Sequence, residues 1–293
     1  MTPTRRIIGI SLLRNEEYYA LWSLNNVLDF CDEIIILDNQ STDGTSRKVE
    51  AFAERHPGVS VHSIPDPHLS HDYIKHYAGE DVWVFGVDGD EVYDPVGLAR
   101  LRQRILAGEF QEYWTLAGYM LHAVKMDLES GRAEGYISPH SPRGNKLHNF
   151  SALISWEKPG RQRLHGPTKV FRPGYHRKDN LDLFAQAPWE SCDLRALHLC
   201  FFPRSSHDTV HPALRKNPST LRVKGVRKIQ RRVKDFIAAP FSKTAGYKTR
   251  RYARGPIVNR EIASFGRPSL DRYADPDAAE AEKVMALRHH NRS

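Results

Sequence analysis

The stretch VWVFGVDGDE, residues 82–91, decides the fold and the candidate site. Its apolar part is rich in β-branched and aromatic residues, which predicts a buried strand. The strand leads directly to Asp88 and Asp90, and Glu91 follows at once. Buried carboxylates need a countercharge, and Mg²⁺, which binds carboxylates together with substrate phosphates, is a natural candidate. The alternative is a solvated Asp-Gly-Asp turn, in which Gly89 adopts an unusual backbone conformation.

Strand and helix patterns alternate through the first part of the chain. The predicted strands cover residues 6–13, 33–37 and 59–64, and a fourth strand begins at 82. Helices are predicted at about 17–30, after residue 45 up to about 54, and near 70–78. This alternation predicts a parallel sheet with right-handed crossovers. Polar residues follow the strands: Asn15 and Glu16, then Asp38, then Asp88 and Asp90. Because such strands end at one edge of the sheet, the three clusters predict a binding site there.

Three motifs together resemble the N-terminal half of family 2 glycosyltransferases, which have the GT-A fold. They are Asn15-Glu16-Glu17, LDNQSTDGT at 37–45 and VDGDE at 87–91, and the resemblance covers roughly residues 6–110. It implies a Rossmann-like α/β fold with a mixed sheet flanked by helices. It also implies a UDP- or GDP-sugar donor, a Mn²⁺ or Mg²⁺ ion, and inversion at the anomeric carbon. The implied donor-binding residues are Arg14, Glu16, Asp38, Asp88 and Gly89, and the implied metal ligands are Asp88 and Asp90.

Two acidic residues of these motifs also have structural interpretations. Asp43 precedes a Gly-Thr pair and is well placed to cap the helix that begins there. Glu17 fits the first turn of its own helix, where the helix dipole favours a carboxylate. Asp38 is less suited to capping, because it ends a strand several residues before the helix. We therefore expect a structural role for Asp43 and a donor contact for Asp38.

The second half of the chain is less regular. Strands are predicted at about 111–124, 169–173 and 197–199, and residues 129–149 are predicted to form a loop. That loop either closes over a substrate or is an ordinary surface loop. The segment ALHLCFFPRS at 196–205 is similar to one in family 2-like and family 92-like transferases. By that resemblance His198 is a third metal ligand, since neutral imidazole binds divalent metals, and His165 is the alternative.

An inverting transfer needs a general base that takes the proton of the acceptor hydroxyl. The segment from Trp189 to Arg195 resembles the acidic segment of the family, although the Glu-Asp pair itself is missing. Glu190, Asp193 and Asp182 are therefore the candidate bases. Glu190 is favoured, because the neighbouring Trp189 could pack on a sugar face. If none of the three serves, a retaining mechanism becomes the alternative.

The chain has 293 residues, a formal net charge of +8 and three cysteines. This length suits one large domain or two closely packed halves. We expect a donor-binding half at 1–115, an acceptor-binding half at 116–210 and a basic helical extension at 211–293. So few cysteines, and an odd number, do not form a disulfide framework. No stretch has the form of a signal peptide or the length of a membrane span, and these features favour the cytoplasm.

The excess positive charge lies in residues 211–254, where Lys and Arg alternate with apolar residues at near-helical spacing. This pattern predicts a basic amphipathic helix that binds an anionic membrane surface, which would place the protein at the inner face of the membrane. One alternative is a solvated helix that docks on the domain through its apolar stripe. The other is a contact with the phosphate backbone of a nucleic acid.

The predicted function is a metal-dependent glycosyltransferase that uses a nucleotide diphosphate sugar. Its acceptor would be an envelope polysaccharide or a lipid-linked saccharide, and the metal and basic groups would stabilise the departing diphosphate. A nucleic-acid glycosyltransferase, such as a phage base-modifying enzyme, is the first alternative. The second is a non-catalytic module that binds nucleotides or polyanions. Metal-dependent hydrolysis of the donor would distinguish this module from both enzymes.

Overall fold

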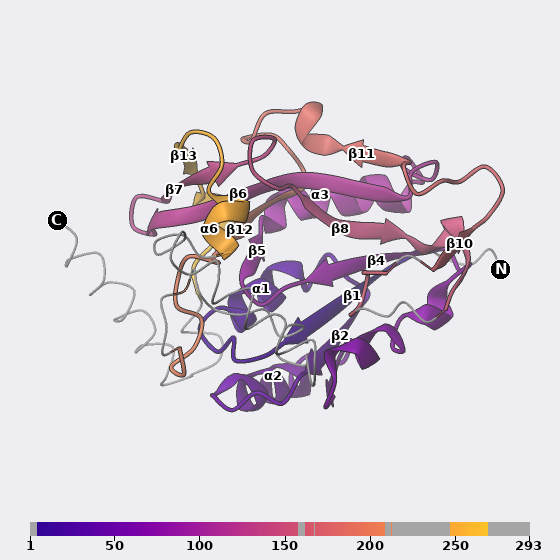
Figure 1. The fold of residues 1–293 in the computed structure, drawn as a ribbon, viewed down its shortest axis with the longest axis horizontal. Helices are drawn as coiled ribbons and strands as arrows, with labels where there is room; N and C mark the ends of the chain where they lie inside the picture. Colours follow the sequence, from indigo (N-terminus) through magenta and orange to yellow (C-terminus); the bar gives the residue numbers. More distant parts are fainter. Residues whose placement is uncertain (1–4, 158–161, 167, 209–211, 213–246, 269–293) are drawn as a thin grey trace, which may run out of the picture.

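The computed structural model describes residues 5–157, 162–166, 168–208, 212 and 247–268. Its sheet begins with four parallel strands in the order β3-β2-β1-β4. Figure 1 labels β2, β1 and β4 of this order. The four strands are β1 (Arg6–Leu13), β2 (Glu33–Asp38), β3 (Val59–Ser63) and β4 (Val82–Val87). The helices α1 (Ala20–Val27) and α2 (Thr45–Glu54) connect them. The predicted alternation of strands and helices in this part of the chain is confirmed.

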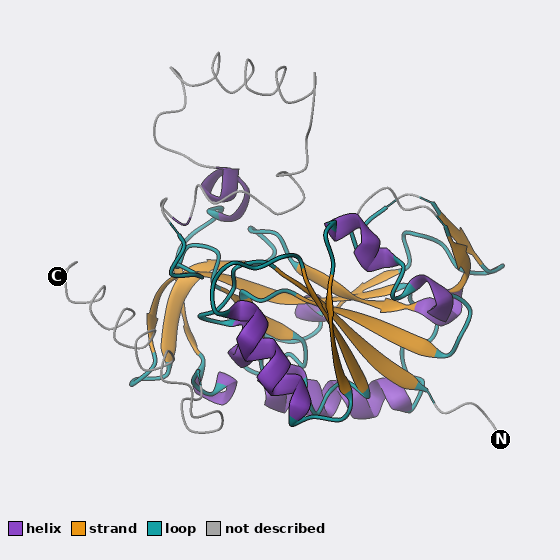
Figure 2. Cartoon of the chain, turned by 90° about the horizontal axis from the view of Figure 1, so that it is seen from below, coloured by secondary structure: helices purple, strands orange, loops and turns teal. Residues whose placement is uncertain are grey.

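Both faces of β1, β2 and β4 are buried, whereas the edge strand β3 is buried only at its start. Successive side chains of a strand point to opposite faces. In β1, Ile7 and Leu13 belong to one apolar cluster and Ile8 and Ile10 to the other. The first cluster packs on α1, α2 and α3 (Pro95–Leu106), and these helices lie together on one side of the sheet (Figure 2). The continuous apolar sequence of these strands is typical of a sheet covered on both faces.

The sheet continues with antiparallel strands and is therefore mixed. Beyond β4 it adds β8 (Gly144–Asn149), β6 (Thr115–Asp127), β7 (Arg132–Ile137) and β13 (Val258–Glu261). Three short strands join it off this path: β5 (Glu91–Tyr93), β11 (Asn180–Asp182) and β12 (Arg195–His198). The strands β9 (Leu153–Trp156) and β10 (Lys169–Phe171) form a separate pair. The predicted α/β class with a mixed sheet flanked by helices is confirmed.

The remaining elements are short. They are α6 (Tyr247–Tyr252) and the 3₁₀ turns η1 (Pro67–His71), η2 (Lys75–Tyr77), η3 (Phe150–Ala152), η4 (Leu183–Ala185) and η7 (Ala263–Phe265). The helix expected near 70–78 is thus replaced by two 3₁₀ turns. No helix in the described ranges is both long enough and apolar enough to cross a membrane.

The prediction of a loop at 129–149 is wrong, since this segment contributes β7 and β8 to the sheet. The inward positions of β7 include Ala133 and Gly135, which are too small to give a visible apolar alternation. A Cβ atom on Gly135 would lie 2.4 Å from the carbonyl oxygen of His122 on the neighbouring strand. The close approach of β6 and β7 therefore requires glycine at this position. Glycine is uncommon inside strands, so the same residue made the strand hard to predict from the sequence.

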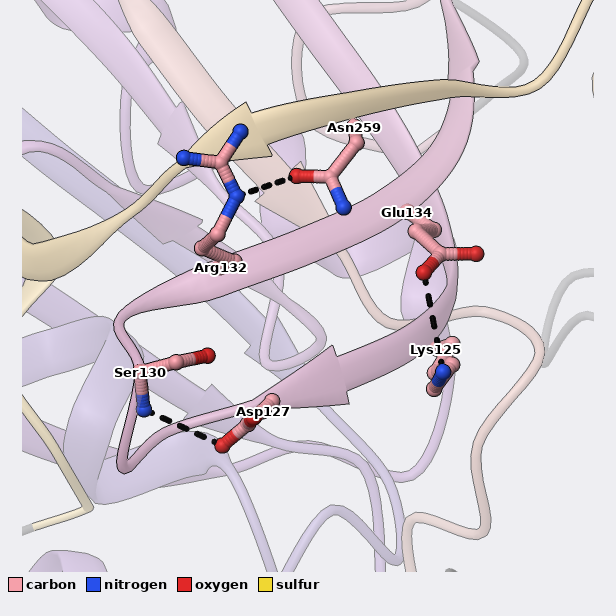
Figure 3. Close-up of a pocket in the computed structure, with 6 residues that line it drawn as sticks. All are labelled: Lys125, Asp127, Ser130, Arg132, Glu134 and Asn259. Carbon is pink, nitrogen blue, oxygen red and sulfur yellow. Dashed lines mark hydrogen bonds and ion pairs between the residues drawn. The ribbon is translucent and has the colours of Figure 1, made fainter. Parts of the chain in front are cut away.

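The sheet does not break at the two expected domain boundaries. β6 begins at Thr115 and pairs with β8, which itself pairs with β4 of the first half. On the far side β13 pairs with β7, and Arg132 donates a 2.6 Å hydrogen bond to Asn259 beside a shallow pocket (Figure 3). Most of the predicted basic helix at 211–254 lies outside the described residues. Its described end, α6, packs on the domain.

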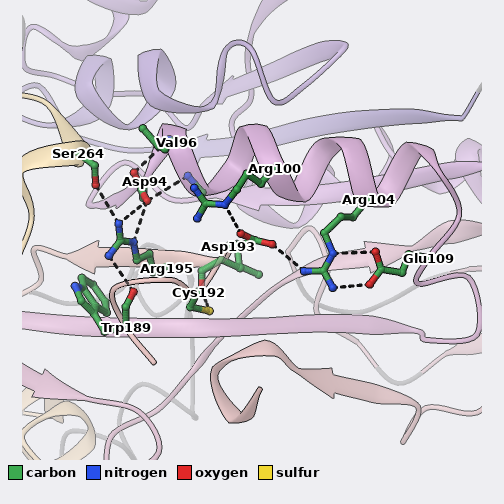
Figure 4. Close-up of polar contacts among 12 residues, drawn as sticks. Asp94, Val96, Arg100, Arg104, Glu109, Trp189, Cys192, Asp193, Arg195 and Ser264 are labelled. Carbon is green, nitrogen blue, oxygen red and sulfur yellow. Dashed lines mark hydrogen bonds and ion pairs between the residues drawn. The ribbon is translucent and has the colours of Figure 1, made fainter. Parts of the chain in front are cut away.

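A buried ion pair joins the two halves behind the sheet edge (Figure 4). Asp94 is fully buried and accepts the amides of Val96 and Gly97 at the start of α3. It also accepts a 2.9 Å hydrogen bond from Arg195 of β12. Arg195 donates further to the carbonyl of Trp189. One carboxylate thus caps a helix and balances a buried guanidinium.

We predict that Asp94→Ala destabilises the fold by about 3 kcal/mol or more, because it leaves Arg195 buried without its countercharge and removes a helix cap. Urea unfolding followed by circular dichroism measures the change. Asp72→Ala, which removes an exposed pair with Lys75, is the control and should stay within about 0.5 kcal/mol of the parent. Equal effects of the two substitutions would contradict the assignment.

Candidate functional site

A cleft of about 870 Å³ opens where β1 and β4 end. Its acidic lining residues are Glu16, Asp88, Asp90 and Glu91. Its basic lining residues are Arg143, Lys146, Arg163, Lys169, Arg177, Arg204, Lys248 and Arg251. Basic groups therefore outnumber acidic groups two to one, and the cleft has the electrostatic character of an anion-binding site.

Asp88 is held by two cations from the second half of the chain. One carboxylate oxygen accepts from Arg163 and the other from Lys146. Lys146 on β8 also lies 3.1 Å from Glu91, whose second oxygen accepts from Tyr93 at 3.0 Å. Burial alone would raise the pKa of Asp88, but Arg163 and Lys146 outweigh it and lower the pKa. Burial raises the pKa of Glu91 in spite of Lys146.

Asp90 is more deeply buried than Asp88, with 7% of its side chain exposed against 24%. Its Oδ2 atom accepts from Arg204 at 2.5 Å, and Arg204 also lies 3.0 Å from Glu16. The Nε2 atom of His198 is 3.5 Å from the same oxygen. Burial would raise the pKa of Asp90, but Arg204 and His198 hold it well below its usual value. The carboxylate is therefore charged.

Two histidines lie side by side at the end of the cleft. His122 on β6 is opposite His198 on β12 in the strand register, and their Nδ1 atoms are 2.7 Å apart. The Nε2 atom of His122 contacts the carbonyl oxygen of Pro142 at 2.9 Å, so this nitrogen carries the proton. Burial lowers the pKa of His122 to about 3. Burial also acts to lower the pKa of His198, but Cys200 and Asp90 raise it to about 10.

The alternative of a solvated Asp-Gly-Asp turn is wrong. Gly89 has no left-handed backbone conformation, and Asp90 is buried. A Cβ atom at Gly89 would lie 2.8 Å from Leu13 and 2.9 Å from Glu16. Glycine is therefore needed because the chain between the two carboxylates packs directly on the end of β1.

The first two motifs interlock at the edge of the sheet. The backbone amide of Asn15 donates to Ser41, its side chain accepts the Thr42 amide at 2.8 Å, and the Glu16 amide donates to Thr45. Asn15 has a φ of 54°, a conformation that asparagine tolerates better than most residues. The predicted gathering of strand-end motifs is confirmed, and much of it consists of contacts between the motifs themselves.

The acidic residues of these motifs have structural partners. Asp38 accepts hydrogen bonds from Ser41 and Ser46. Asp43 accepts the Thr45 amide at the start of α2, as expected, although Gly44 occupies the N-cap position. Glu17 does not lie in α1, which begins only at Ala20.

Glu17 instead accepts the amides of Gly44 and Ser206. Its expected position in the first turn of α1 is therefore corrected. It ties the start of α2 to the segment that follows β12.

Of the expected donor-binding residues, Glu16, Asp88 and Gly89 line the cleft, whereas Arg14 and Asp38 do not. Arg14 lies against Asn39, at 3.4 Å from its side-chain oxygen. His165, the alternative metal ligand, lines the cleft as well. Burial, together with Lys146 and Arg163, lowers the pKa of His165 to about 4.

The three candidate bases lie outside the residues that line the cleft. Asp193 is bound by Arg100 and Arg104 of α3, each at 2.8 Å (Figure 4). Glu190 is exposed. Asp182 pairs with Arg143, which does line the cleft.

The position of Trp189 contradicts the reason for favouring Glu190 as the base. Trp189 is 2% exposed, stacks on Phe265 with ring centroids 5.8 Å apart and donates to the carbonyl of Glu261. Its ring is therefore part of the core and cannot pack on a sugar.

Several residues of the cleft were not predicted as site residues. They include Lys146, Arg163, His122, Lys248 and Tyr252. Lys146 belongs to the segment mistaken for a loop. His122 could have been found only from its register with His198, which depends on strand pairing rather than on any local pattern. Lys248 and Tyr252 are in α6, at the end of the predicted basic region.

No protein-family model matches the chain. The sequence is similar to the lipopolysaccharide core biosynthesis glycosyltransferase LpsC of Rhizobium meliloti (strain 1021), with 28% identity over 120 residues. The aligned region spans 40% of this chain and 43% of LpsC, so the chain matches less than half of that relative.

Similarity to solved structures is limited. The mannosyltransferase PcManGT from Pyrobaculum calidifontis, solved with GDP-Man and Mn²⁺, has a TM-score of 0.33 and 22% identity, over 43% of this chain and 37% of that one. The mannose-6-phosphate isomerase from Helicobacter pylori has a TM-score of 0.31 and 14% identity, over 47% and 56%. At these scores the shared part is too small to assign a function.

We predict that Lys146→Met destabilises the protein by about 3 kcal/mol at neutral pH, because Asp88 and Glu91 lose a buried countercharge. Protonation of these carboxylates removes their need for the cation, so the difference from the parent should shrink as the pH falls. Urea unfolding at several pH values measures it. Lys125→Met, which removes an exposed pair with Glu134, is the control and should show a small loss that does not follow this trend.

Proposed function

We propose that the chain is a glycosyltransferase that binds a nucleotide diphosphate sugar in the 870 Å³ cleft. The observation that carries the proposal is the excess of basic over acidic residues around Asp88 and Asp90, at the carboxyl ends of parallel strands. A diphosphate supplies the negative charge that this excess attracts, and ligands of such sheets bind at this edge. The volume is within the usual range for small-ligand sites. The partial similarity to LpsC supports the same activity.

The cleft suits a divalent cation at Asp90. Its Oδ1 atom makes no hydrogen bond within the described part of the chain, and carboxylate oxygen is a preferred ligand of Mg²⁺ and Mn²⁺. Asp88 instead has both oxygens bound by Arg163 and Lys146. His198 has its two nitrogens directed at His122 and Asp90. We therefore propose Asp90 as the direct metal ligand, with His198 as the residue that orients its carboxylate. Asp88 is retained as a charged neighbour of the site and not as a direct ligand.

In the proposed reaction the basic residues hold and stabilise the diphosphate. A bound Mn²⁺ or Mg²⁺ would supply additional positive charge to the leaving group. Lys248 lies at the cleft with its pKa lowered to about 8 by burial and by Arg204, and Arg251 follows on the same helix. Lys248, Arg251 and Arg177 all line the cleft, and their positive charges are suited to the phosphate oxygens.

We propose Asp182 as the base that deprotonates the acceptor hydroxyl, with inversion as the expected outcome. Among the three candidates it is the one whose partner, Arg143, lines the cleft. Its Oδ1 atom is buried and has no hydrogen-bond partner within the described ranges. Such an oxygen can accept the proton of an acceptor that enters beside Arg143.

The proposed acceptor is an envelope polysaccharide or a lipid-linked saccharide. LpsC is named for lipopolysaccharide core biosynthesis, which supports this class. The proposed location is the cytoplasm, at the inner face of the membrane through residues 211–254. Binding of nucleic acid by wild-type protein, with no binding to anionic vesicles, would favour the nucleic-acid glycosyltransferase instead. Donor binding without any turnover would favour the non-catalytic module.

We predict that Asp90→Asn abolishes Mn²⁺-dependent donor binding, because it replaces the proposed charged ligand by a neutral one. Isothermal titration calorimetry with UDP- and GDP-sugars, with and without Mn²⁺, measures the effect and identifies the nucleotide. Asp81→Asn changes an aspartate just before the same strand, paired with Arg5, and should bind like the parent. Unchanged Mn²⁺-dependent affinity of a folded Asp90→Asn protein would refute the ligand assignment.

We predict that Asp182→Asn lowers kcat by about a hundredfold or more and leaves the donor affinity unchanged, because a base acts on the acceptor. Steady-state transfer assays and donor titration measure the two quantities. Asp193→Asn tests the alternative base. It should lower the stability of the protein and leave kcat unchanged, since Asp193 binds two arginines of α3. The reverse pattern would transfer the role to Asp193.

A further inference from the structure

Three potential metal ligands meet beside the carboxylate site. His122 is on β6, His198 ends β12 and Cys200 follows two residues later. Their ligand atoms all lie within 4.8 Å of one another, and all three residues are buried. The pairing of β6 with β12 is parallel and places His122 directly opposite His198. The sheet therefore fixes the two histidines, and Cys200 lies in the turn that follows β12.

The two imidazole rings are oriented by contacts at their outer nitrogens. The Nε2 atom of His122 donates to the carbonyl of Pro142 at 2.9 Å, and that of His198 faces Oδ2 of Asp90 at 3.5 Å. The Nδ1 atoms are left facing each other, 2.7 Å apart. Histidine ligands of metals are commonly held in this way, with the outer nitrogen bound to a carbonyl or a carboxylate.

Two imidazoles and one thiol form a donor set typical of Zn²⁺ and similar ions, whereas Mg²⁺ prefers oxygen. In a tetrahedral zinc site, neighbouring ligand atoms lie roughly 3.3–3.8 Å apart, as follows from metal–ligand bonds of about 2.0–2.3 Å. The Nδ1 atoms would separate slightly and the sulfur would approach.

The three-residue cluster is covered by α6 on one side and open to the cleft on another. Tyr252 of α6 packs on His122 and His198, with ring centroids 4.6 Å and 4.9 Å away. Lys248 donates to the carbonyl of Cys200 at 3.2 Å. Both histidines line the cleft while Cys200 is fully buried, so an ion can enter from the cleft. Three protein ligands and an accessible fourth position are the pattern of an open zinc site.

We propose that His122, His198 and Cys200 bind one divalent ion of the zinc type, at a site distinct from the oxygen ligand of Asp90. Asp90 contributes to this site only through its contact with His198. The site does not depend on the proposed transferase activity. It would also connect α6, through Tyr252, to the centre of the sheet.

Co²⁺ is the probe, because its absorption reports thiolate ligation. Full-length protein is freed of metal with a chelator, titrated with Co²⁺ alone, and followed by absorption spectroscopy. We expect one equivalent to bind, with a thiolate-to-cobalt charge-transfer band in the near ultraviolet that excess Mg²⁺ does not remove. Absence of this band in the wild-type protein, or its loss on addition of Mg²⁺, would overturn the proposal.

Variants then locate the ligands. Cys200→Ser should lose the charge-transfer band, and His122→Gln should weaken Co²⁺ binding by about tenfold or more. Cys192→Ser is the matched control, because Cys192 is also a buried thiol but donates to the carbonyl of Leu194 instead. A band that survives in folded Cys200→Ser protein overturns the proposal. If Cys200→Ser protein does not fold, an unchanged Co²⁺ affinity of His122→Gln protein overturns the proposal.

Discussion

The structure depends on the neutralisation of carboxylates that β4 delivers into the interior. Asp88, Asp90 and Glu91 follow one buried strand, and an uncompensated charge in such a position is unfavourable. The cations come from far along the chain: Lys146 from β8, Arg163 from the segment before β10, and Arg204 from beyond β12. Folding of the second half is therefore coupled to a charge requirement set by the first.

This coupling explains why the sheet continues past the parallel strands. β8 lies directly beside β4 in antiparallel pairing, and this neighbour position brings Lys146 to the end of β4. β12 pairs with both β5 and β6, which brings His198 to Asp90 and to His122. Each added strand supplies a polar partner as well as apolar area. Within the described residues, the cleft takes groups from both sides of positions 115 and 210.

The sequence was sufficient to predict the strands and the gathering of their ends where apolar runs alternate with helices and polar residues end the strands. The bounds of β1 agree with the prediction at both ends, and the strand-end motifs meet as expected. It was insufficient where a strand has small or polar inward residues, as in β7 with Gly135 and in β8. Lys146 of the cleft was missed for the same reason. The pairing of Lys146 with Asp88 can be predicted only when β8 is placed next to β4, and no local sequence pattern encodes that strand pairing.

The charge of the cleft has a consequence for its ligand. The cations that neutralise Asp88 and Asp90 are largely committed to those carboxylates, whereas Lys169, Lys248 and Arg177 add charge beyond that requirement. Burial and neighbouring arginines lower the pKa values of both lysines to about 8. Their charged forms are therefore less favourable in the free protein than those of an ordinary exposed lysine. An anion bound between them would stabilise those charged forms. Binding of an anionic donor should therefore take up protons near pH 8, and the same groups would release them when the anion leaves.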